Sequence, residues 1–87
     1  MFAYILRTDS PSDDKGDEFF KRFVETPGLL HVFDLRGVDN PDDELVVAIW
    51  QDRKAAEAYL NNSPLRQEVD QTFSGVTRTM YEVVNGK

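Results

Sequence analysis

The sequence predicts an α+β protein of the ferredoxin-like βαββαβ type, with a four-stranded antiparallel sheet that carries its helices on one face. Apolar residues alternate in four short segments and recur at helical spacing in two longer regions. The order of these segments is strand, helix, strand, strand, helix, strand, which is the split βαβ arrangement. With 87 residues and no linker or internal repeat, residues 1–87 are expected to form one domain.

The first 28 residues predict a strand followed by a helix. Residues 2–7 are mostly aromatic and aliphatic and end at a Thr-Asp-Ser-Pro break, which is typical of a strand that runs into a turn. A helix is expected from about Asp13 to Thr26, because its apolar residues lie one, three and four positions apart. These residues are Phe19, Phe20, Phe23 and Val24. Pro27-Gly28 ends the helix, since proline disfavours helical geometry in the residue before it.

Two further strands are expected to form a hairpin across the turn-rich residues 37–44. Residues 29–36 alternate, and one face of this strand is expected to carry Leu29, His31, Phe33 and Leu35. The next strand, residues 45–50, is apolar on both of its faces. An antiparallel sheet commonly leaves one face to water, so two apolar faces demand a layer beyond the helices. We expect that layer to be a second copy of the protein.

The last third of the chain predicts a divided helical region and a final strand. Asp52 is placed to cap a helix over residues 53–61. Ser63-Pro64 restarts the helix, with the serine expected to accept from the first-turn amides. The side chains expected to face inward from the two pieces are Ala56, Tyr59, Leu60, Leu65, Val69 and Phe73. Residues 77–84 form the last strand.

Composition narrows the range of partners and locations. The formal net charge is −6, from 16 acidic and 10 basic residues, and such a field repels phosphate backbones and anionic membranes. The absence of cysteine excludes disulfides and thiolate metal sites. Residues 39–44 lack the glycine and distal glutamate of a calcium loop, so we interpret them as a solvated turn. A strand that begins at Phe2 leaves no room for a signal peptide, and we expect a soluble, cytoplasmic protein.

Four features of the chain, taken in order, resemble the antibiotic biosynthesis monooxygenase family. They are Pro27-Gly28-Leu29-Leu30, the turn-rich residues 37–44, the apolar strand that ends at Trp50, and the helical segment 52–60. The likeness covers nearly the whole chain. Members of this family are dimeric α+β barrels in which two sheets pack face to face, so the resemblance implies a homodimer through the open sheet face.

The same resemblance implies an oxygenase that works without metal, flavin or other cofactor. Its substrate would be an electron-rich, aromatic or polyketide-type molecule held in a pocket between the sheet and the helices. The substrate anion would itself reduce oxygen, while the protein supplies a dry cavity, orientation and a proton acceptor. The haem-degrading branch needs a histidine on the helix after the tryptophan, and residues 52–73 contain none, so haem ligation from that segment is not expected.

Two residues are the main catalytic candidates. Trp50 matches the strand tryptophan that lies against the substrate in oxygenases of this kind, although a large aromatic residue there also serves to close the core. His31 is the only histidine, and its near-neutral titration suits a base that removes a phenolic proton. A structural histidine is the equal alternative for His31. The register between the two strands decides whether His31 and Trp50 share a pocket.

Three further residues complete the expected site. Arg78 is a catalytic candidate, because its fork of donors can hold an oxyanion. Tyr59 is a substrate-binding candidate that can donate a hydrogen bond from the helix. Val46 is the position where some members of the family carry an asparagine, and valine cannot bond a substrate oxygen. Arg78 and Tyr59 also fit structural roles, as an ion-pair partner and a half-buried helix residue.

Two other functions fit the sequence. One is a non-catalytic dimeric binding or interaction module, whose pocket is filled by the protein's own aromatic side chains. The six phenylalanines and the valine at position 46 favour it. The other is a non-oxidative isomerase or cyclase on the same scaffold, which differs from an oxygenase in adding no oxygen atom to its product.

Overall fold

The computed structural model describes residues 1–8 and 14–87, with the side chains of 1–8 and 16–87. Its elements are β1 (Phe2–Arg7), α1 (Asp14–Phe23), β2 (Leu29–Arg36), β3 (Glu44–Trp50), α2 (Arg53–Asn62), α3 (Pro64–Thr72) and β4 (Thr77–Glu82). The expected order of strands and helices is confirmed, and the second helical region divides at Ser63–Pro64 as predicted. The expected start of the first helix at Asp13 lies outside the described residues.

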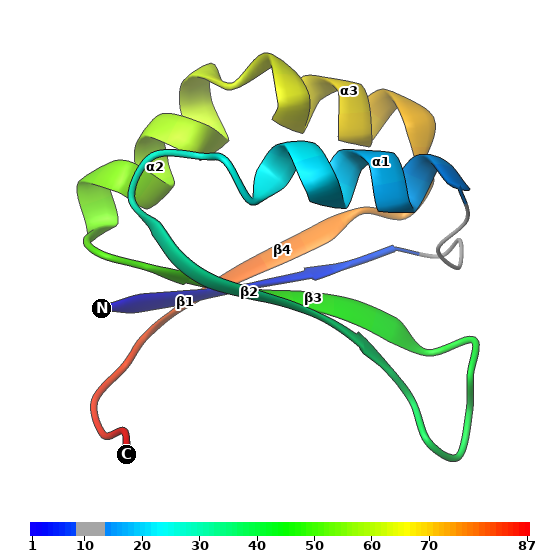
Figure 1. Ribbon diagram of the computed structural model, residues 1–87, viewed down its shortest axis with the longest axis horizontal. Helices are drawn as coiled ribbons and strands as arrows, with labels where there is room; N and C mark the ends of the chain where they lie inside the picture. The colour runs from blue at the N-terminus through cyan, green and yellow to red at the C-terminus, as the bar shows by residue number, and fades with distance from the viewer. Residues whose placement is uncertain (9–13) are drawn as a thin grey trace.

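The four strands form one sheet, and all three helices lie over one of its faces (Figure 1). The strand order is β2-β3-β1-β4, and each neighbouring pair is antiparallel. This topology confirms the ferredoxin-like prediction. The hairpin loop between β2 and β3 and the C-terminal tail extend on the side away from the helices (Figure 1). In the described part of the chain, no helix has the length and apolar character that a membrane span requires.

The core lies between the sheet and the helices and is centred on four aromatic side chains. Tyr4 of β1 and Trp50 of β3 are the largest fully buried residues, at 1% and 0% exposed. Phe23 of α1 and Tyr59 of α2 cover them, with ring centroids 5.9 Å and 5.7 Å from that of Trp50. Burial of these rings removes a large apolar area from water, which holds α1 and α2 on this face of the sheet.

The beginning of β2 departs from simple alternation. A β-bulge places Leu29 opposite Trp50 and His31 opposite Ile49. Leu29 packs against the core on the helix side, so the prediction that it shares a face with His31 and Phe33 is wrong. The physical reason is the bulge, because its extra residue shifts the alternation of side chains.

The caps of α2 and α3 differ. The Asp52 carboxylate accepts from the Ala55 amide at 2.8 Å, as predicted. Ser63 makes no side-chain capping bond, so that prediction is wrong. Its backbone N–H instead donates to the Tyr59 carbonyl at 3.2 Å and closes α2, while Pro64 supplies the preset geometry for the start of α3.

Replacement of Asp52 by alanine is expected to lower the free energy of unfolding by about 1 kcal/mol, because the Ala55 amide loses its acceptor. Urea unfolding followed by circular dichroism measures this difference. Asp39→Ala, in the exposed hairpin loop, is the matched control and is expected to change the free energy by less than about 0.5 kcal/mol. Equal unfolding midpoints for the two variants would contradict the capping role of Asp52.

Residues of the acidic hairpin loop between β2 and β3 form hydrogen bonds with one another. The Gly37 amide donates to the Asp43 carbonyl at 2.7 Å, and the Asp42 amide donates to the Asn40 side-chain oxygen at 3.1 Å. Arg7 pairs with the Asp43 carboxylate at 2.9 Å. Among the described side chains, no group of three or more potential metal ligands is gathered. The hydrogen bonds within the loop and the exposure of its residues are those of a solvated turn.

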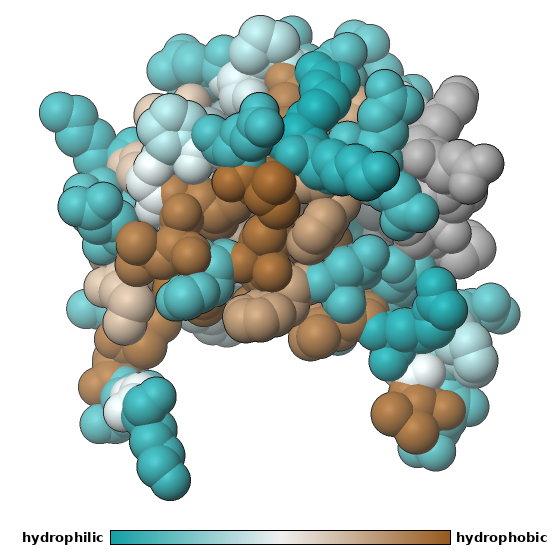
Figure 2. Space-filling view, in the orientation of Figure 1, coloured by the Kyte–Doolittle hydropathy of each residue, from teal (hydrophilic) through white to brown (hydrophobic). Residues whose placement is uncertain are grey.

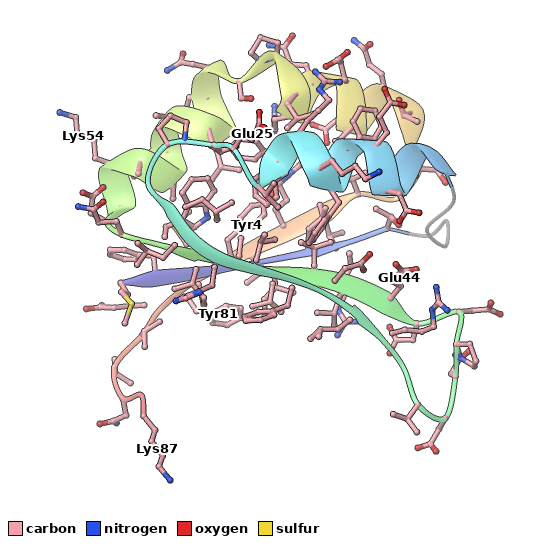
Figure 3. All side chains as sticks on the ribbon, in the orientation of Figure 1. Tyr4, Glu25, Glu44, Lys54, Tyr81 and Lys87 are labelled. Atoms are coloured by element: carbon pink, nitrogen blue, oxygen red, sulfur yellow. The ribbon has the colours of Figure 1, made fainter. Side chains whose placement is uncertain are left out.

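The sheet face away from the helices is apolar and, within the described chain, uncovered. The side chains that alternate onto it include Ile5, Phe33, Leu35, Val47, Ile49 and Tyr81. Figure 3 shows Tyr81 on the side of the sheet opposite the helices. In Figure 2, hydrophobic side chains form a band at the level of the sheet, below the mostly hydrophilic helices. Both faces of β3 are therefore apolar, as the sequence predicts.

Candidate ligand pocket

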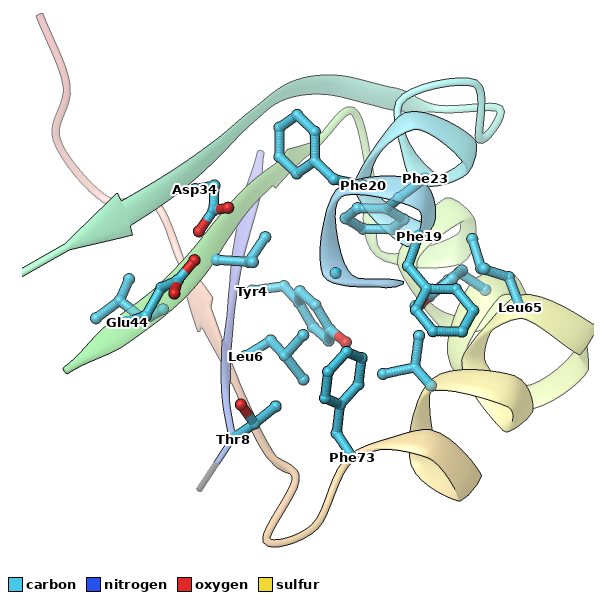
Figure 4. A pocket seen from close by; sticks show the side chains of 15 residues that line it. Tyr4, Leu6, Thr8, Phe19, Phe20, Phe23, Asp34, Glu44, Leu65 and Phe73 are labelled. Carbon is cyan, nitrogen blue, oxygen red and sulfur yellow. The ribbon is translucent and has the colours of Figure 1, made fainter. Parts of the chain in front are cut away.

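A pocket opens between the helix-covered face of the sheet and helices α1 and α3 (Figure 4). Its floor includes Tyr4 and Leu6 of β1 and Val46 of β3. The roof comes from the apolar faces of α1 and α3 and the residue that ends α3, namely Phe19, Phe20, Phe23, Leu65, Val69 and Phe73. The pocket therefore lies where the resemblance implied it, and its walls suit an apolar, flat ligand.

The enclosed space is small. Its cavity volume is about 90 Å³, whereas an engineered apolar cavity that takes up benzene measures about 150 Å³. A ligand of two fused rings therefore extends through the mouth of the pocket or displaces the helices outward. The rings of Phe19 and Phe73, with centroids 5.8 Å apart, occupy part of the roof.

A row of polar groups connects the floor of the pocket to the helices. Arg78 of β4 donates through Nε to the Tyr4 hydroxyl oxygen at 2.6 Å. Its Nη1 lies 2.6 Å from Asp70 Oδ1 of α3, and Asp70 Oδ2 lies 3.3 Å from Arg66 Nε. The Arg78 side chain is 12% exposed, so this ion pair is largely withdrawn from water. Arg78 therefore fixes the position of the Tyr4 hydroxyl, and Asp70 holds Arg78 in place.

The protonation states in this row follow from burial and from neighbouring charge. Burial raises the pKa of Tyr4, although the charge of Arg78 opposes the shift. Burial also raises the pKa of Tyr59. Burial opposes the charge of Arg78, but Tyr4 and Asp70 outweigh it and raise the Arg78 pKa. At neutral pH both tyrosines are therefore neutral hydroxyl groups and Arg78 is a cation.

Two carboxyl groups line another side of the pocket (Figure 4). Asp34 comes from β2 and Glu44 from the neighbouring strand β3. Burial raises the pKa of Asp34 to about 6, and a hydrogen bond with Glu44 and the charges of Glu44 and Asp17 add to the shift while Arg36 opposes it. A carboxyl group that titrates near neutrality beside an apolar pocket has the properties of a general base.

Three of the five predicted site residues lie at or next to the pocket. Val46 and Tyr59 line it. Arg78 reaches it through the Tyr4 hydroxyl. Trp50 is a core residue that packs on Phe23 and Tyr59, and its Nε1 is buried with no hydrogen-bond partner among the described residues. Its position agrees with the structural role considered for this residue.

The fifth predicted residue, His31, lies on the opposite face of the sheet. It is paired with Ile49, the residue before Trp50, and successive strand side chains point to opposite faces. Its exposed ring stacks on Phe33 with the centroids 6.4 Å apart. The register therefore separates His31 from Trp50, and His31 does not line the pocket.

Sequence reasoning missed Tyr4, Asp34 and Asp70. Tyr4 has the pattern of an ordinary strand residue, and its partner Arg78 is 74 positions away in the chain. Asp34 left a detectable signal, because it alternates with Val32 onto the face that packs under the helices, where an acidic residue is unusual. Asp70 lies in a helix rich in polar residues, and no feature of the sequence distinguishes it from its polar neighbours.

Comparison with solved structures identifies the fold. SnoaB, a cofactor-independent oxygenase from Streptomyces nogalater, matches with a TM-score of 0.75 and 17% sequence identity, covering 98% of this chain and 94% of that one. A Deinococcus radiodurans protein assigned to the antibiotic biosynthesis monooxygenases matches with a TM-score of 0.71 and 16% identity, covering 100% and 96%. The fold is that of the antibiotic biosynthesis monooxygenases. The resemblance read from the sequence is thereby confirmed at the level of fold.

The antibiotic biosynthesis monooxygenase fold also carries haem chemistry. MhuD, a heme-degrader from Mycobacterium tuberculosis, matches with a TM-score of 0.68 and 23% identity, covering 100% of this chain and 99% of that one. No protein-family model and no curated protein sequence matches the chain. In this chain the one histidine lies on the open face, so the pocket offers no imidazole for haem iron.

Proposed function

We propose that this protein is a small cofactor-independent monooxygenase that binds an aromatic, polyketide-type molecule between its sheet and its helices and oxidises it with molecular oxygen. The observation that carries the proposal is Asp34, which lines an apolar pocket beside Glu44 and whose pKa burial raises to about 6. The pocket lies in a fold shared with a cofactor-independent oxygenase. The substrate class is a hydroxylated aryl ketone with a ring CH₂ group that the conjugated carbonyl makes acidic.

The proposed reaction needs one proton acceptor and a dry site. The Asp34 carboxylate takes the acidic proton, and the delocalised anion that remains transfers one electron to O₂. Recombination of the two radicals forms a carbon–oxygen bond, and loss of water converts a ring CH₂ into a ring C=O. In total, one CH₂ group and one O₂ molecule give one C=O group and one H₂O molecule. The apolar walls orient the ring and keep bulk water from the anion.

We also propose that two copies form a homodimer through their open sheet faces. The apolar side chains of β2 and β3 on that face, including Phe33 and Val47, would then be covered by the same residues of the second copy. Domains of this length bury a limited share of their surface, so a second copy adds stabilisation that one chain lacks. A continuous exposed apolar face of this kind is typical of an interaction surface.

The cavity volume favours a second candidate function, a non-catalytic dimeric module. A space of about 90 Å³ encloses less than one aromatic ring, and the Phe19 and Phe73 rings already occupy the roof. In such a module the aromatic side chains would serve as core, and the protein would neither bind nor oxidise a two-ring molecule.

Oxygen consumption separates the two candidates. The wild-type protein is incubated in an oxygen electrode with a panel of hydroxyanthrones, whose ring CH₂ is the group that the proposed step oxidises. The products formed in ¹⁸O₂ are analysed by mass spectrometry. A monooxygenase is expected to accelerate oxygen uptake and to place one labelled atom in the product. Uptake equal to that of the protein-free solution for every member of the panel contradicts the oxygenase proposal and supports the non-catalytic module.

Replacement of Asp34 by asparagine is expected to slow oxygen uptake about a hundredfold, because the proton acceptor is lost. In the wild-type protein the rate is expected to rise with pH to a plateau above about pH 6, as Asp34 ionises. The variant is expected to lose that rise. Asp39→Asn, the same change in the exposed hairpin loop, is the control and should keep both the rate and its pH profile. An unchanged profile in Asp34→Asn removes Asp34 from the mechanism.

The same variant is expected to be more stable than the wild type at neutral pH. Because the Asp34 pKa is raised from 3.8 to about 6, the folded protein holds a proton between these values that the unfolded chain has released. The free energy of unfolding therefore falls as the pH rises through this range and stays lower above it. Asp34→Asn removes the loss, which is about 1 kcal/mol once the partial solvent exposure of Asp34 is allowed for. Urea unfolding at pH 4 and pH 7 tests the expectation, and a variant no more stable than the wild type at pH 7 contradicts it.

A further inference from the structure

The Tyr4 hydroxyl lies at the pocket and accepts a hydrogen bond from Arg78. The Tyr4 ring projects from β1 into the pocket, toward the helices (Figure 4). The residue is 1% exposed, so its hydroxyl has little access to bulk water. Arg78 donates to the hydroxyl oxygen, and this bond uses the oxygen as an acceptor. Among the side chains that the structure describes, none is recorded as the acceptor of the hydroxyl proton.

Arg78 and Asp70 favour the Tyr4 hydroxyl as a hydrogen-bond donor. Arg78 is held against Asp70, so its guanidinium stays charged and directed at the Tyr4 oxygen. Such a bond polarises the hydroxyl and strengthens it as a donor to a second group. Arg78 Nη2 is itself buried without a hydrogen-bond partner in the described part of the chain, which leaves a further donor near the same end of the network.

We propose that Tyr4 donates a hydrogen bond to a carbonyl or phenolate oxygen of the ligand, with Arg78 and Asp70 as positioning residues. The inference rests on the proposed function, because it concerns the same pocket. It also narrows the ligand class to quinones, aryl ketones and their phenolates. A carbonyl oxygen that enters an apolar pocket needs such a partner to replace the water it loses. A hydrocarbon of the same shape gains nothing from Tyr4.

Two ligands of one shape test the inference by binding alone. Trp50 is the only tryptophan and packs 5.7 Å from Tyr59, a pocket residue, so its fluorescence can report occupancy. The probes are 1,4-naphthoquinone, which carries carbonyl acceptors, and naphthalene, which carries none. Tyr4→Phe removes one hydroxyl and keeps the ring. It is expected to weaken naphthoquinone binding about tenfold and to leave naphthalene binding unchanged.

A spectroscopic measurement identifies the bond directly. Infrared difference spectra of bound naphthoquinone are expected to show one carbonyl band at lower frequency than in an apolar solvent. In Tyr4→Phe that band should return to the solvent position. In Arg78→Gln it should shift part of the way back, because Tyr4 keeps its hydroxyl but loses the group that polarises and fixes it. A purely structural role for Arg78 would lower stability without moving the band.

The outcomes separate this inference from the proposed function. Selective loss of naphthoquinone affinity and of the shifted band in Tyr4→Phe supports it. If the wild type binds both probes and Tyr4→Phe weakens neither or both equally, the role of Tyr4 is overturned while the pocket and its proposed function stand. If the wild type binds neither probe, both proposals fail. A thermal melt of Tyr4→Phe close to that of the wild type shows that the comparison is made on folded protein.

Discussion

Phe33→Arg is expected to leave the protein monomeric. Phe33 is 53% exposed on the open sheet face, so its ring contributes little to the fold of a single chain. Phe33 is the cross-strand neighbour of Val47 in its own sheet, so in a face-to-face dimer both side chains lie within the apolar layer. An arginine there buries a charge without a partner, which costs several kcal/mol and outweighs the dimer contacts it replaces. Sedimentation equilibrium at micromolar concentration is expected to give twice 10.0 kDa for the wild type and 10.0 kDa for the variant.

Val24→Arg is the matched control for this experiment. Val24 is 46% exposed and directly follows α1 on the helix-covered side of the sheet, away from the open face, and it receives the same charge. The control is expected to keep the wild-type mass. Circular dichroism of Phe33→Arg shows whether the monomer stays folded. A stable, folded wild-type monomer at the same concentration contradicts the proposed homodimer, whatever the variants do.

The fold could be predicted from the sequence because its elements depend on local patterns. The Asp52 cap and the restart at Pro64 each depend on residues within a few positions, and both lie where expected. The first helix ends at Phe23, before the predicted end at Thr26, and Pro27-Gly28 lies in the turn between α1 and β2. The two apolar faces of β3 followed from alternation alone. The bulge at Leu29 did not, because it depends on how β2 pairs with β3, and no single position encodes that pairing.

The site was less predictable because it is assembled across the sheet. Arg78 was correctly singled out as a candidate, but its contact with Tyr4 depends on the pairing of β1 with β4, the two ends of the chain. The chemistry of His31 and Trp50 made a shared pocket a hypothesis, but the register of β2 on β3 places the two side chains on opposite faces of the sheet. The Asp34–Glu44 pair likewise comes from two strands and has no spacing that marks it as a unit.

Gly28→Ala is expected to lower the free energy of unfolding by about 3 kcal/mol. Gly28 has φ = 83°, a left-handed conformation that costs a residue with a Cβ atom about 1–2 kcal/mol. A Cβ atom at this position would also lie 2.4 Å from Cβ of Ala55, so the turn and α2 must separate. That movement strains the bond from the Gln51 amide to the Gly28 carbonyl, 2.9 Å long, which joins the turn to the end of β3. Urea unfolding measures the loss, and Gly86→Ala, whose added Cβ meets nothing closer than 3.9 Å, should show none.

The two causes of this loss separate in a double-mutant cycle with Ala55→Gly. Removal of the Ala55 methyl group relieves the overlap but leaves the left-handed backbone at position 28. By itself, Ala55→Gly lowers the stability by about 1 kcal/mol, because glycine has a lower helix propensity than alanine. If the close approach of the turn to α2 contributes, Gly28→Ala combined with Ala55→Gly loses at least about 1 kcal/mol less than the sum of the single variants. Strict additivity would assign the whole requirement for glycine to backbone conformation. The turn would then tolerate a wider separation from α2, and Tyr59 on that helix would not depend on Gly28 for its place in the pocket.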